Sequence, residues 1–416
     1  MTYFEAREYI SSLTSRGIVP GLDAVSRLLA ALGDPQDDLN IIHIAGTNGK
    51  GSVCVFTETA LMHDGKSVCR FSSPAVGDYL EMFTYNGIPV NETLYARAAA
   101  DIKAAAQGLE ADGVFPTSFE AETAAAFLMF SRLKPDYAII ECGMGGALDA
   151  TNVIKNSIVS VITSISSDHT AFLGGTIKEI AQNKAGIIKP AGIVVSATQP
   201  TEAAEVIKKA AAEQSAELYF VGDIKNIVYH GDLTEFEYKN DHCAIKMLGA
   251  CQPQNAALAI EAASRLGISR TAIKNGLSSA WLPFRFERIG KFILDGAHNE
   301  GAARMLAKSL ELYTKPEKTA FICGCFRDKD YKSIAELTAP FAAAVYCIKP
   351  PTERGLPSAG LCRAFKAAGA EAHDCGDMYT AIDAASREEY DHIIIFGSLS
   401  ILKEARDIIG DHYGES

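Results

Sequence analysis

Short apolar runs alternate with longer helical patterns along most of this chain. In the first part, strand-like runs lie at residues 41–45, 66–71, 137–140, 158–165 and 192–197, and helical patterns lie at residues 52–63, 91–110, 118–133 and 176–185. Strands that alternate with helices at this spacing are typical of a mostly parallel sheet with helices on both faces. Residues 1–40 resemble two short helices.

The alternation pauses and then begins again. Residues 72–90 read as a long, turn-rich loop, and residues 219–247 as short alternating segments that predict a small antiparallel appendage. Residues 252–280 return to a helical pattern, and a linker follows at 282–287. Beyond the linker, strands are predicted at 291–295, 318–323, 343–348 and 392–397, with helices at 300–313, 331–338, 358–367 and 399–409.

This organisation predicts two α/β domains. A chain of 416 residues exceeds the usual size of a single hydrophobic core. We expect an N-terminal domain over residues 1–283, with a mostly parallel sheet, a phosphate-binding loop and the antiparallel appendage. A smaller, Rossmann-like domain is expected over residues 284–416.

The stretch IIHIAGTNGKGS at residues 41–52 carries the clearest chemistry. A buried strand leads into a glycine-rich loop and then a helix, a pattern that can wrap backbone N–H groups around phosphate oxygens. Lys50 supplies a point charge and Ser52 a hydroxyl for Mg²⁺. Gly51 separates them, unlike in the common phosphate loop, and the alternative is an ordinary turn.

Composition narrows the class of protein. The net charge of −12 argues against a nucleic-acid or anionic membrane surface, although a local basic pocket can still bind a nucleotide. The first residues form an amphipathic helical pattern rather than a signal peptide, and no run is long enough to span a bilayer. Ten scattered cysteines, without metal-site spacing, predict buried reduced thiols in a cytoplasmic protein.

Ligands of parallel sheets bind beyond the carboxyl ends of the strands, where polar residues end several apolar runs. Glu141 is placed like an acid that holds Mg²⁺, the alternative being a surface-facing residue. His169 is either a metal ligand or a residue that begins a helix after Asp168. Ser73 lies in an ordinary Ser-Ser-Pro turn, and Lys184 taken alone would be a snorkelling lysine.

A second candidate site lies in the C-terminal domain, where LDGAHN at residues 294–299 follows a strand and opens a helix. Asp295 is suited to a ribose hydroxyl or water, and His298 to base or phosphate contacts. The alternative is a capped helix start.

Taken together, these motifs resemble the folylpolyglutamate synthase/dihydrofolate synthase family, within the Mur ligase superfamily. The resemblance covers nearly the whole chain. Besides the phosphate loop, its motifs are FSSP (71–74), FEAETAAAF (119–127), ECGMGGALDATN (141–152), SDHTAFLG (167–174), IAQNKAGIIKP (180–190), QNAALA (254–259), FRFE (284–287), LDGAHN (294–299) and FGSLS (396–400). Several such motifs in one order are far more specific than any single one.

The resemblance implies an ATP-dependent amide ligase in which ATP phosphorylates a carboxylate and the amine of L-glutamate attacks the acyl phosphate. It implies one or two Mg²⁺ ions, a folate or dihydropteroate as second substrate, a monomer, and closure of the second domain over ATP. The catalytic residues implied are Lys50, His169 and a carbamylated Lys184. The ATP-binding residues implied are Gly46, Thr47, Asn48, Gly49, Lys50, Gly51, Ser52, Asn255, Arg285, Asp295 and His298. Metal ligation is implied for Ser52, Ser73, Glu141 and His169, and substrate binding for Pro74, Glu120, Asp149 and Thr151.

The chain departs from the family pattern at five positions. Ala75 replaces a histidine, Met82 and Ala147 replace arginines, Phe284 replaces a glycine, and Asn183 replaces an acid. Because the first three lie in loops facing the second substrate, they leave open a Mur-type ligase with a different acid or amine. A non-catalytic nucleotide-dependent switch is a third hypothesis, which the set Lys50, Glu141, His169 and Lys184 disfavours.

Overall fold

The structure is a computed structural model that describes residues 1–17, 19–75, 77–168 and 170–413. Two compact units interleave along the sequence. Met1–Asp223 and Gln254–Ala280 form the first unit, and Ile224–Pro253 and Trp281–Ser416 form the second. The third and last crossing of the chain between units, after Ala280, lies close to the expected boundary after residue 283, while the antiparallel appendage groups with the second unit.

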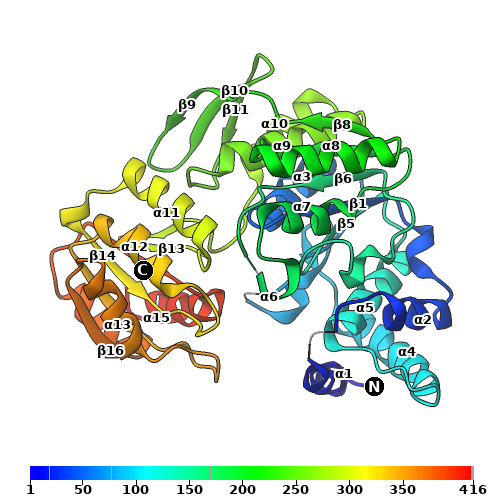
Figure 1. Ribbon diagram of the computed structural model, residues 1–416, viewed down its shortest axis with the longest axis horizontal. Helices are drawn as coiled ribbons and strands as arrows, with labels where there is room; N and C mark the ends of the chain where they lie inside the picture. The colour runs from blue at the N-terminus through cyan, green and yellow to red at the C-terminus, as the bar shows by residue number, and fades with distance from the viewer. Residues whose placement is uncertain (18, 76, 169, 414–416) are drawn as a thin grey trace. The chain divides into compact units, whose positions relative to one another are not determined.

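An eight-stranded sheet, in the order β4-β3-β2-β5-β1-β6-β7-β8, forms the first unit (Figure 1). The strands from β2 to β8 in this order are parallel, and β3 and β4 add an antiparallel hairpin at one edge. The strands are β1 (Ile41–Ala45), β2 (Val68–Phe71), β3 (Phe83–Tyr85), β4 (Ile88–Pro89), β5 (Tyr137–Glu141), β6 (Val159–Ile162), β7 (Ile193–Ser196) and β8 (Glu217–Phe220). Every residue of β1 is buried, as expected for the middle of a parallel sheet.

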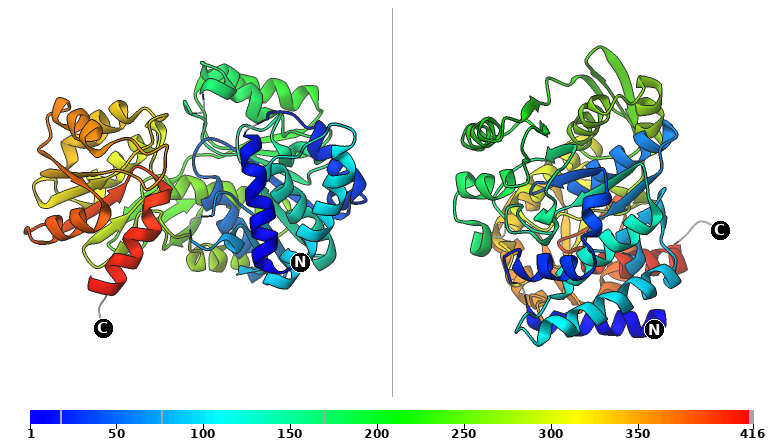
Figure 2. Two further views of the ribbon diagram at one scale, coloured as in Figure 1. Left: turned by 90° about the horizontal axis from the view of Figure 1, so that it is seen from below. Right: turned by 90° about the vertical axis from the view of Figure 1, so that its right-hand side faces the viewer.

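Helices cover this sheet and pack on one another. They are α1 (Tyr3–Ser12), α2 (Asp23–Ala31), α3 (Lys50–His63), α4 (Glu92–Glu110), α5 (Ser118–Leu133), α6 (Thr170–Leu173), α7 (Ile177–Ala185), α8 (Thr201–Glu213), α9 (Gln252–Arg265) and α10 (Arg270–Ser279). α3 packs on β1, β2, β5 and α10, while α1 packs along α4 (Figure 2).

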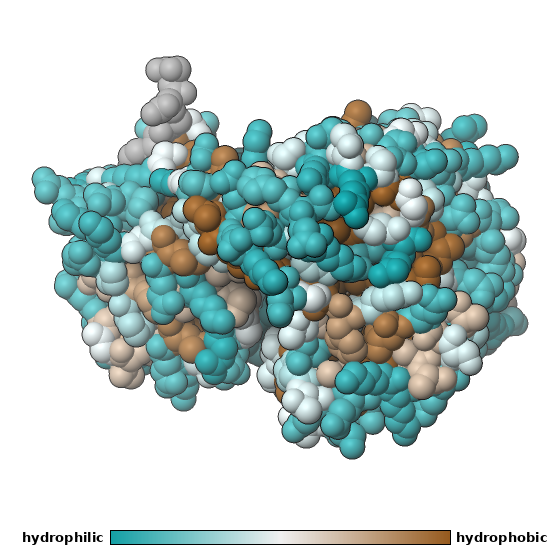
Figure 3. Space-filling view, turned by 90° about the horizontal axis from the view of Figure 1, so that it is seen from above, coloured by the Kyte–Doolittle hydropathy of each residue, from teal (hydrophilic) through white to brown (hydrophobic). Residues whose placement is uncertain are grey.

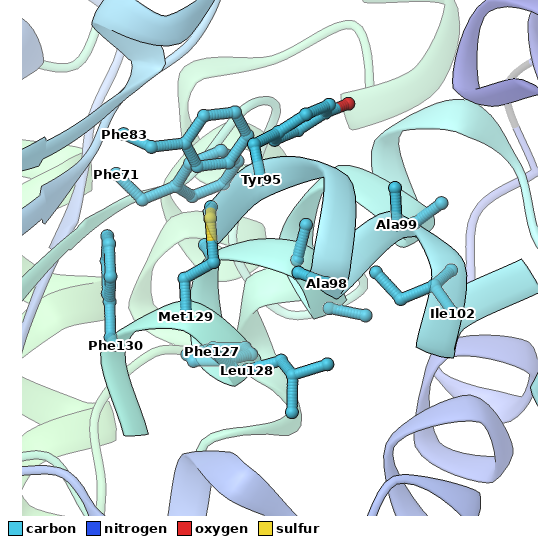
Figure 4. Packing of buried hydrophobic residues seen from close by; sticks show 14 of the residues in the cluster. Phe71, Phe83, Tyr95, Ala98, Ala99, Ile102, Phe127, Leu128, Met129 and Phe130 are labelled. Carbon is cyan, nitrogen blue, oxygen red and sulfur yellow. The ribbon is translucent and has the colours of Figure 1, made fainter. Parts of the chain in front are cut away.

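A large core of the first unit lies between the β2–β3 edge and the helices α4 and α5 (Figure 4). Phe71 and Phe83 stack with their ring centroids 5.3 Å apart, and Tyr95, Phe127 and Phe130 are buried beside them. Burying one such side chain stabilises the fold by about 1.5–3 kcal/mol. This core fixes the base of the loop that follows β2.

The second unit contains two sheets. A six-stranded sheet, in the order β12-β13-β17-β14-β15-β16, is parallel except for β12. Its strands are β12 (Glu287–Ile289), β13 (Phe292–Leu294), β14 (Thr319–Cys323), β15 (Ala344–Ile348), β16 (Ala372–Gly376) and β17 (His392–Phe396). The antiparallel sheet contains β9 (Lys225–Tyr229), β10 (Thr234–Tyr238) and β11 (Asp241–Ile245). The helices are α11 (Glu300–Tyr313), α12 (Tyr331–Thr338), α13 (Ser358–Ala367), α14 (Met378–Ser386) and α15 (Leu402–Tyr413).

The structure corrects several element predictions. The segment 72–90, expected to be all loop, contains the β3–β4 hairpin, because Phe83 and Tyr85 pair with β2. The appendage begins at Lys225, since residues 219 and 220 end the parallel strand β8. The pattern predicted neither α8, β16 nor α14. β16 is one outer strand of its sheet, and its mostly exposed residues leave little apolar periodicity.

The surface and the cysteines agree with the composition. The face in Figure 3 is mostly hydrophilic, with apolar residues in small groups. In the described part of the chain, no helix combines the length and apolarity needed to cross a bilayer. None of the ten cysteines, all of them in the described part of the chain, forms a disulfide, and eight are buried while Cys251 and Cys375 are partly exposed.

Candidate active site

The phosphate loop leaves the buried end of β1 and turns sharply into α3. Gly46 has φ +150°, and a Cβ there would lie 1.8 Å from Thr163 Oγ1 on the chain after β6. Gly49 has φ +91°, and a Cβ there would lie 2.4 Å from Asn255 Oδ1. Both positions therefore require glycine. Asn255, expected at the nucleotide, lies directly against the loop.

We expect Gly46→Ala to destabilise the first unit and abolish nucleotide binding, because the new methyl group meets Thr163 in a backbone conformation that is already strained for other residues. The cost should be about 1–3 kcal/mol of unfolding free energy or more, measured by urea denaturation and ADP titration. Gly108→Ala is the matched control, since nothing lies within 4 Å of its Cβ position on α4. An equal effect of both changes would contradict the packing argument.

The segment after β6 holds the loop in place. The Thr47 N–H donates to the Ser164 carbonyl (2.9 Å), and Thr47 Oγ1 donates to the Ser166 carbonyl and accepts from the Ser166 N–H, both at 3.1 Å. Ser164 Oγ donates to the Asn48 carbonyl (3.2 Å). Ser164 and Ser166 are supporting residues that the sequence analysis did not single out. Their only signal was a serine-rich strand end.

Lys50 and Ser52 occupy the first turn of α3, where backbone N–H groups and the helix dipole favour an anion. Lys50 Nζ donates to the carbonyls of Gly46 (3.2 Å) and Thr47 (3.3 Å), so its charge lies over the loop. Ser52, two residues further along α3, is buried. This arrangement is suited to binding a polyphosphate.

Lys184 comes from the last turn of α7 and points at the same loop. Its Nζ donates to the Gly46 carbonyl (2.8 Å), and the residue is only 2% exposed. A snorkelling lysine keeps its ammonium in water, so that alternative is wrong. Burial, and then the charge of Lys50, lower the pKa of Lys184 from 10.5 to about 7. Two lysines that are far apart in sequence thus converge on one carbonyl.

The loop after Glu141 places Lys184. Cβ atoms at Gly145 and Gly146 would lie 2.4 Å from Asn183 Oδ1 and 2.7 Å from the Asn183 carbonyl. The Ala147 N–H also donates to that carbonyl (2.7 Å). The glycine-rich loop therefore packs against the final turn of α7, which carries Lys184.

The predicted acid and hydroxyl groups follow neighbouring strands. Glu141 ends β5, pairs with Ile44 of β1, and is 6% exposed. Ser73 follows β2, the other neighbour of β5. The β2, β5 and β1 ends therefore meet at one edge of the sheet, as predicted. His169, also predicted there, lies outside the described residues.

The donor set at this edge fits Mg²⁺, which prefers oxygen ligands and commonly keeps water and phosphate in its coordination shell. Ser52 and Ser73 offer hydroxyls and Glu141 a carboxylate. In the described part of the chain, no three His, Cys, Asp or Glu side chains form a metal-binding group. A Mg²⁺ ion here would thus need phosphate and water oxygens, as it does when bound with ATP.

The three polar residues predicted to bind substrate serve the local fold. The Asp149 carboxylate accepts from the Met144 N–H (2.8 Å) and from Thr151 Oγ1 (2.6 Å), and burial raises its pKa. Glu120 accepts from the Thr117 N–H (2.7 Å) in a capping box of α5. Pro74 is exposed. Their substrate contacts stay a prediction.

A buried histidine connects this loop to β1. His43 Nε2 lies 2.8 Å from Thr151 Oγ1. Because the Thr151 hydroxyl donates its one hydrogen to Asp149, the His43 Nε2–H must be the donor in this contact. Burial lowers the pKa of His43 to about 3, so the ring is neutral. The strand that begins the phosphate loop therefore also positions Asp149.

In the second unit, Arg285 lies between two residues with a left-handed backbone conformation. Phe284 and Phe286 have φ +61° and +51°, which explains why a glycine suits position 284. The Phe286 N–H donates to Asp295 Oδ2 (3.0 Å). Arg285 Nη1 lies so near Gly296 that a Cβ there would be 2.3 Å away.

The side chains predicted in this unit are thus neighbours. Asp295 Oδ1 also accepts from the Ala297 N–H (2.9 Å), and His298 Nδ1 lies 2.8 Å from the Gly296 carbonyl. Burial raises the pKa of Asp295, while the charge of Arg285 opposes this shift. The Asp295 carboxylate thus binds the backbone of two turns, through the N–H groups of Phe286 and Ala297. Its nucleotide contact, like those of Arg285 and His298, stays a prediction.

Comparison with known proteins gives the same picture. The Mur ligase middle domain model matches residues 44–263, and the Mur ligase glutamate ligase domain model matches residues 284–399. The dihydrofolate synthase/folylpolyglutamate synthase of Bacillus subtilis is 34% identical over 83% of this chain and 84% of its own. The enzyme of the same name from Escherichia coli is 31% identical over 96% and 94%.

Solved structures agree in fold over the whole chain. Escherichia coli FolC in complex with DHPP and ADP has a TM-score of 0.88 at 27% identity and covers 99% of this chain and 98% of that one. The Mycobacterium tuberculosis folylpolyglutamate synthase complexed with ADP and AMPPCP has a TM-score of 0.88 at 26% identity, with 98% and 99% covered. The chain therefore belongs to the folylpolyglutamate synthase/dihydrofolate synthase family of Mur ligases, which are ATP-dependent ligases.

Proposed function

We propose that this chain uses ATP to join L-glutamate to the carboxylate of a folate, and also of dihydropteroate, through an acyl phosphate. Family membership supports the ligase chemistry. The observation that carries the proposal is the convergence of Lys50 and Lys184 on the Gly46 carbonyl, at 3.2 and 2.8 Å. Burying a second ammonium group this close to Lys50 is costly, and a carbamate on the neutral amine of Lys184 would account for its position.

The two negatively charged substrates must be brought together before phosphoryl transfer. Backbone N–H groups of the loop from Gly46 to Ser52, together with Lys50, hold the β- and γ-phosphates and offset charge that develops on the transferred group. Asn255 borders the loop at Gly49. The remainder of the nucleotide would be bound by Arg285, Asp295 and His298 of the second unit.

Mg²⁺, when bound, neutralises phosphate charge and orients the oxygens for in-line transfer. One or two Mg²⁺ ions would be coordinated by Ser52, Ser73, Glu141 and His169. The Ser73 and Glu141 side chains also border the place where the substrate carboxylate must approach the γ-phosphate.

Lys184 is suited to carry a carbamate. The neutral amine attacks CO₂, an N–C bond forms, and one proton is released to solvent, which leaves an anionic oxygen donor. With a pKa of about 7, the amine is largely neutral in mildly alkaline solution, whereas an ordinary lysine is not. The carbamate would then be a partner for the magnesium shell.

The deciding experiment offers dihydropteroate and tetrahydrofolate separately, with ATP and L-glutamate, and identifies the products by mass spectrometry. We expect one added glutamate on each acid and one phosphate released per addition. Phosphate release with neither product would reject the folate assignment. Size-exclusion chromatography of the same sample tests the expected monomer.

The alternative is a Mur-type ligase with another acid or amine, and the substitutions in the substrate-facing loops motivate it. Met82 is buried in the core of the first unit, and Ala75 packs against the same cluster. Neither presents the charge that the family pattern has there. A thermal-shift screen of folates, amino acids and short peptides separates the two hypotheses. Stabilisation by peptides alone would favour the alternative.

A further inference from the structure

Arg70 lies on β2, two residues before the Ser72-Ser73-Pro74 loop, and connects three elements of the site. Its side chain is 11% exposed. The Nε–H donates to Glu58 Oε2 (2.7 Å), and Nη1 donates to Ser72 Oγ. One guanidinium thus joins the phosphate-loop helix α3, which carries Glu58, to the loop that carries Ser73.

Glu58 holds this corner of the unit together. Its side chain is 3% exposed and accepts, besides Arg70, the Thr84 hydroxyl (2.8 Å) and the Gly87 N–H (3.2 Å) of the β3–β4 hairpin. A buried carboxylate needs such partners, because burial of an unpaired charge is costly. The helix that begins with Lys50 is therefore fastened to the strands on either side of the Ser73 loop.

The position of Arg70 also brings positive charge to Glu141. Arg70 pairs with Ile139 of β5, so Glu141, two residues further along, lies on the same face of the sheet as Arg70. Burial lowers the pKa of the guanidinium, but Glu58 above all, with smaller contributions from Cys54 and Glu141, outweighs burial and raises it. Arg70 thus places a fixed cation on the Glu141 face of the sheet as well as against the loop that carries Ser73.

A departure from the family pattern lies close to this cation. The pattern has an arginine at position 82, where this chain has the buried Met82. Position 82 lies directly across from Ser72, since the Ser72 N–H donates to the Met82 carbonyl (3.0 Å). Arg70 therefore supplies a guanidinium to a loop that has no arginine at position 82.

We propose that Arg70 is a positioning residue for the metal-binding edge: by holding Ser72 it orients the adjacent Ser73 hydroxyl, and by pairing with Glu58 it keeps that loop in register with α3. This inference rests on the proposed function, because it presumes that Ser73 and Glu141 bind Mg²⁺ with a nucleotide. Groups that orient metal ligands commonly change metal affinity by about 10–100-fold when they are replaced.

The test compares Arg70→Lys, Ser72→Ala and Thr84→Val. In Arg70→Lys the charge is kept, but a single ammonium cannot donate to both Glu58 and Ser72 as the guanidinium does. In Ser72→Ala the loop contact is removed while the Arg70–Glu58 pair remains. Thr84→Val is the matched control, since it removes a Glu58 contact of the hairpin without touching the loop. Mn²⁺ affinity is measured by electron paramagnetic resonance in the presence of ADP, with the melting temperature and the kcat for product formation.

We expect Arg70→Lys and Ser72→Ala to weaken Mn²⁺ binding by about tenfold and to lower kcat, with ADP affinity in the absence of metal unchanged. Thr84→Val should lower the melting temperature and leave Mn²⁺ affinity at the wild-type value. Wild-type Mn²⁺ affinity in both folded test variants, or an equal loss in Thr84→Val, would overturn the proposal. If the wild type forms no glutamylated product, the proposed function fails, while the Mn²⁺ comparison still decides the role of Arg70.

Discussion

Lys50→Ala is expected to abolish product formation, with a loss in kcat of about a hundredfold to a thousandfold, because it removes the one charge of the loop that lies over the phosphate cradle. Lys50 Nζ is held by the Gly46 and Thr47 carbonyls, so the ammonium is placed in the loop before a nucleotide binds. Single-turnover phosphate release and mass spectrometry of the product measure the effect. Circular dichroism and the melting temperature establish that the variant is folded.

Lys66→Ala is the matched control, since Lys66 follows the other end of the same helix, beyond Asp64. It should retain wild-type turnover. Wild-type turnover in folded Lys50→Ala would contradict the assigned role. If the wild type binds ADP but forms no product with any acid, the chain is a nucleotide-dependent binding protein, the hypothesis that the two lysines disfavour.

Lys184→Ala is the second change with a large expected effect. It should lower kcat by at least about a hundredfold, and added bicarbonate should not restore activity, because the amine that would bind CO₂ is gone. Lys184→Arg should fail equally, since a guanidinium stays protonated and cannot form a carbamate. Lys178→Ala, on the exposed side of the same helix, should behave as the wild type. Full activity in Lys184→Ala would refute the carbamate.

Lys184 also predicts a pH dependence of stability. Its pKa is about 7 in the folded protein and near 10.5 when unfolded, so between these values the unfolded chain binds one more proton. The unfolding free energy of the wild type should therefore rise with pH across this window relative to Lys184→Met. Below about pH 7 the cost of the buried ammonium is fully present. Urea denaturation in CO₂-depleted buffer at pH 6, 7.5 and 9 tests the sign.

The two lysines are electrostatically coupled, which adds a second check. The Lys50 charge is the largest of those that lower the pKa of Lys184, after burial itself. Lys50→Ala should therefore raise the pKa of Lys184 and move the lower limit of the pH-dependent stability window upwards, towards the unfolded value of 10.5. An unchanged window in Lys50→Ala would show that burial alone sets the pKa of Lys184.

Local sequence determined most of the elements that build the site. The run Ile41–Ala45 is apolar throughout and is followed by closely spaced glycines, so a buried strand and a tight loop before α3 could be predicted from short-range patterning. The same holds for Glu141 at the end of β5. The outer strand β16 could not be predicted because its mostly exposed residues show little hydrophobic periodicity. α14 was missed although its buried residues Met378, Ala381, Ile382 and Ala385 follow a helical period.

Only the tertiary structure decided which of these residues meet. The strand order β2-β5-β1-β6 brings Ser73 and Glu141 to one edge with the phosphate loop, and no local pattern encodes that order. Lys184 looked like a snorkelling residue on an Ala- and Ile-rich helix, yet packing of the Gly145–Ala147 loop buries it against Gly46. Arg70 carried no motif at all. Its proposed role depends on the Glu58 carboxylate of α3 and the Ser72 hydroxyl after β2, which contact Arg70 only once the chain is folded. Such contacts depend on side chains distant in sequence, so their energies, including the depressed pKa of Lys184, are properties of the assembled core.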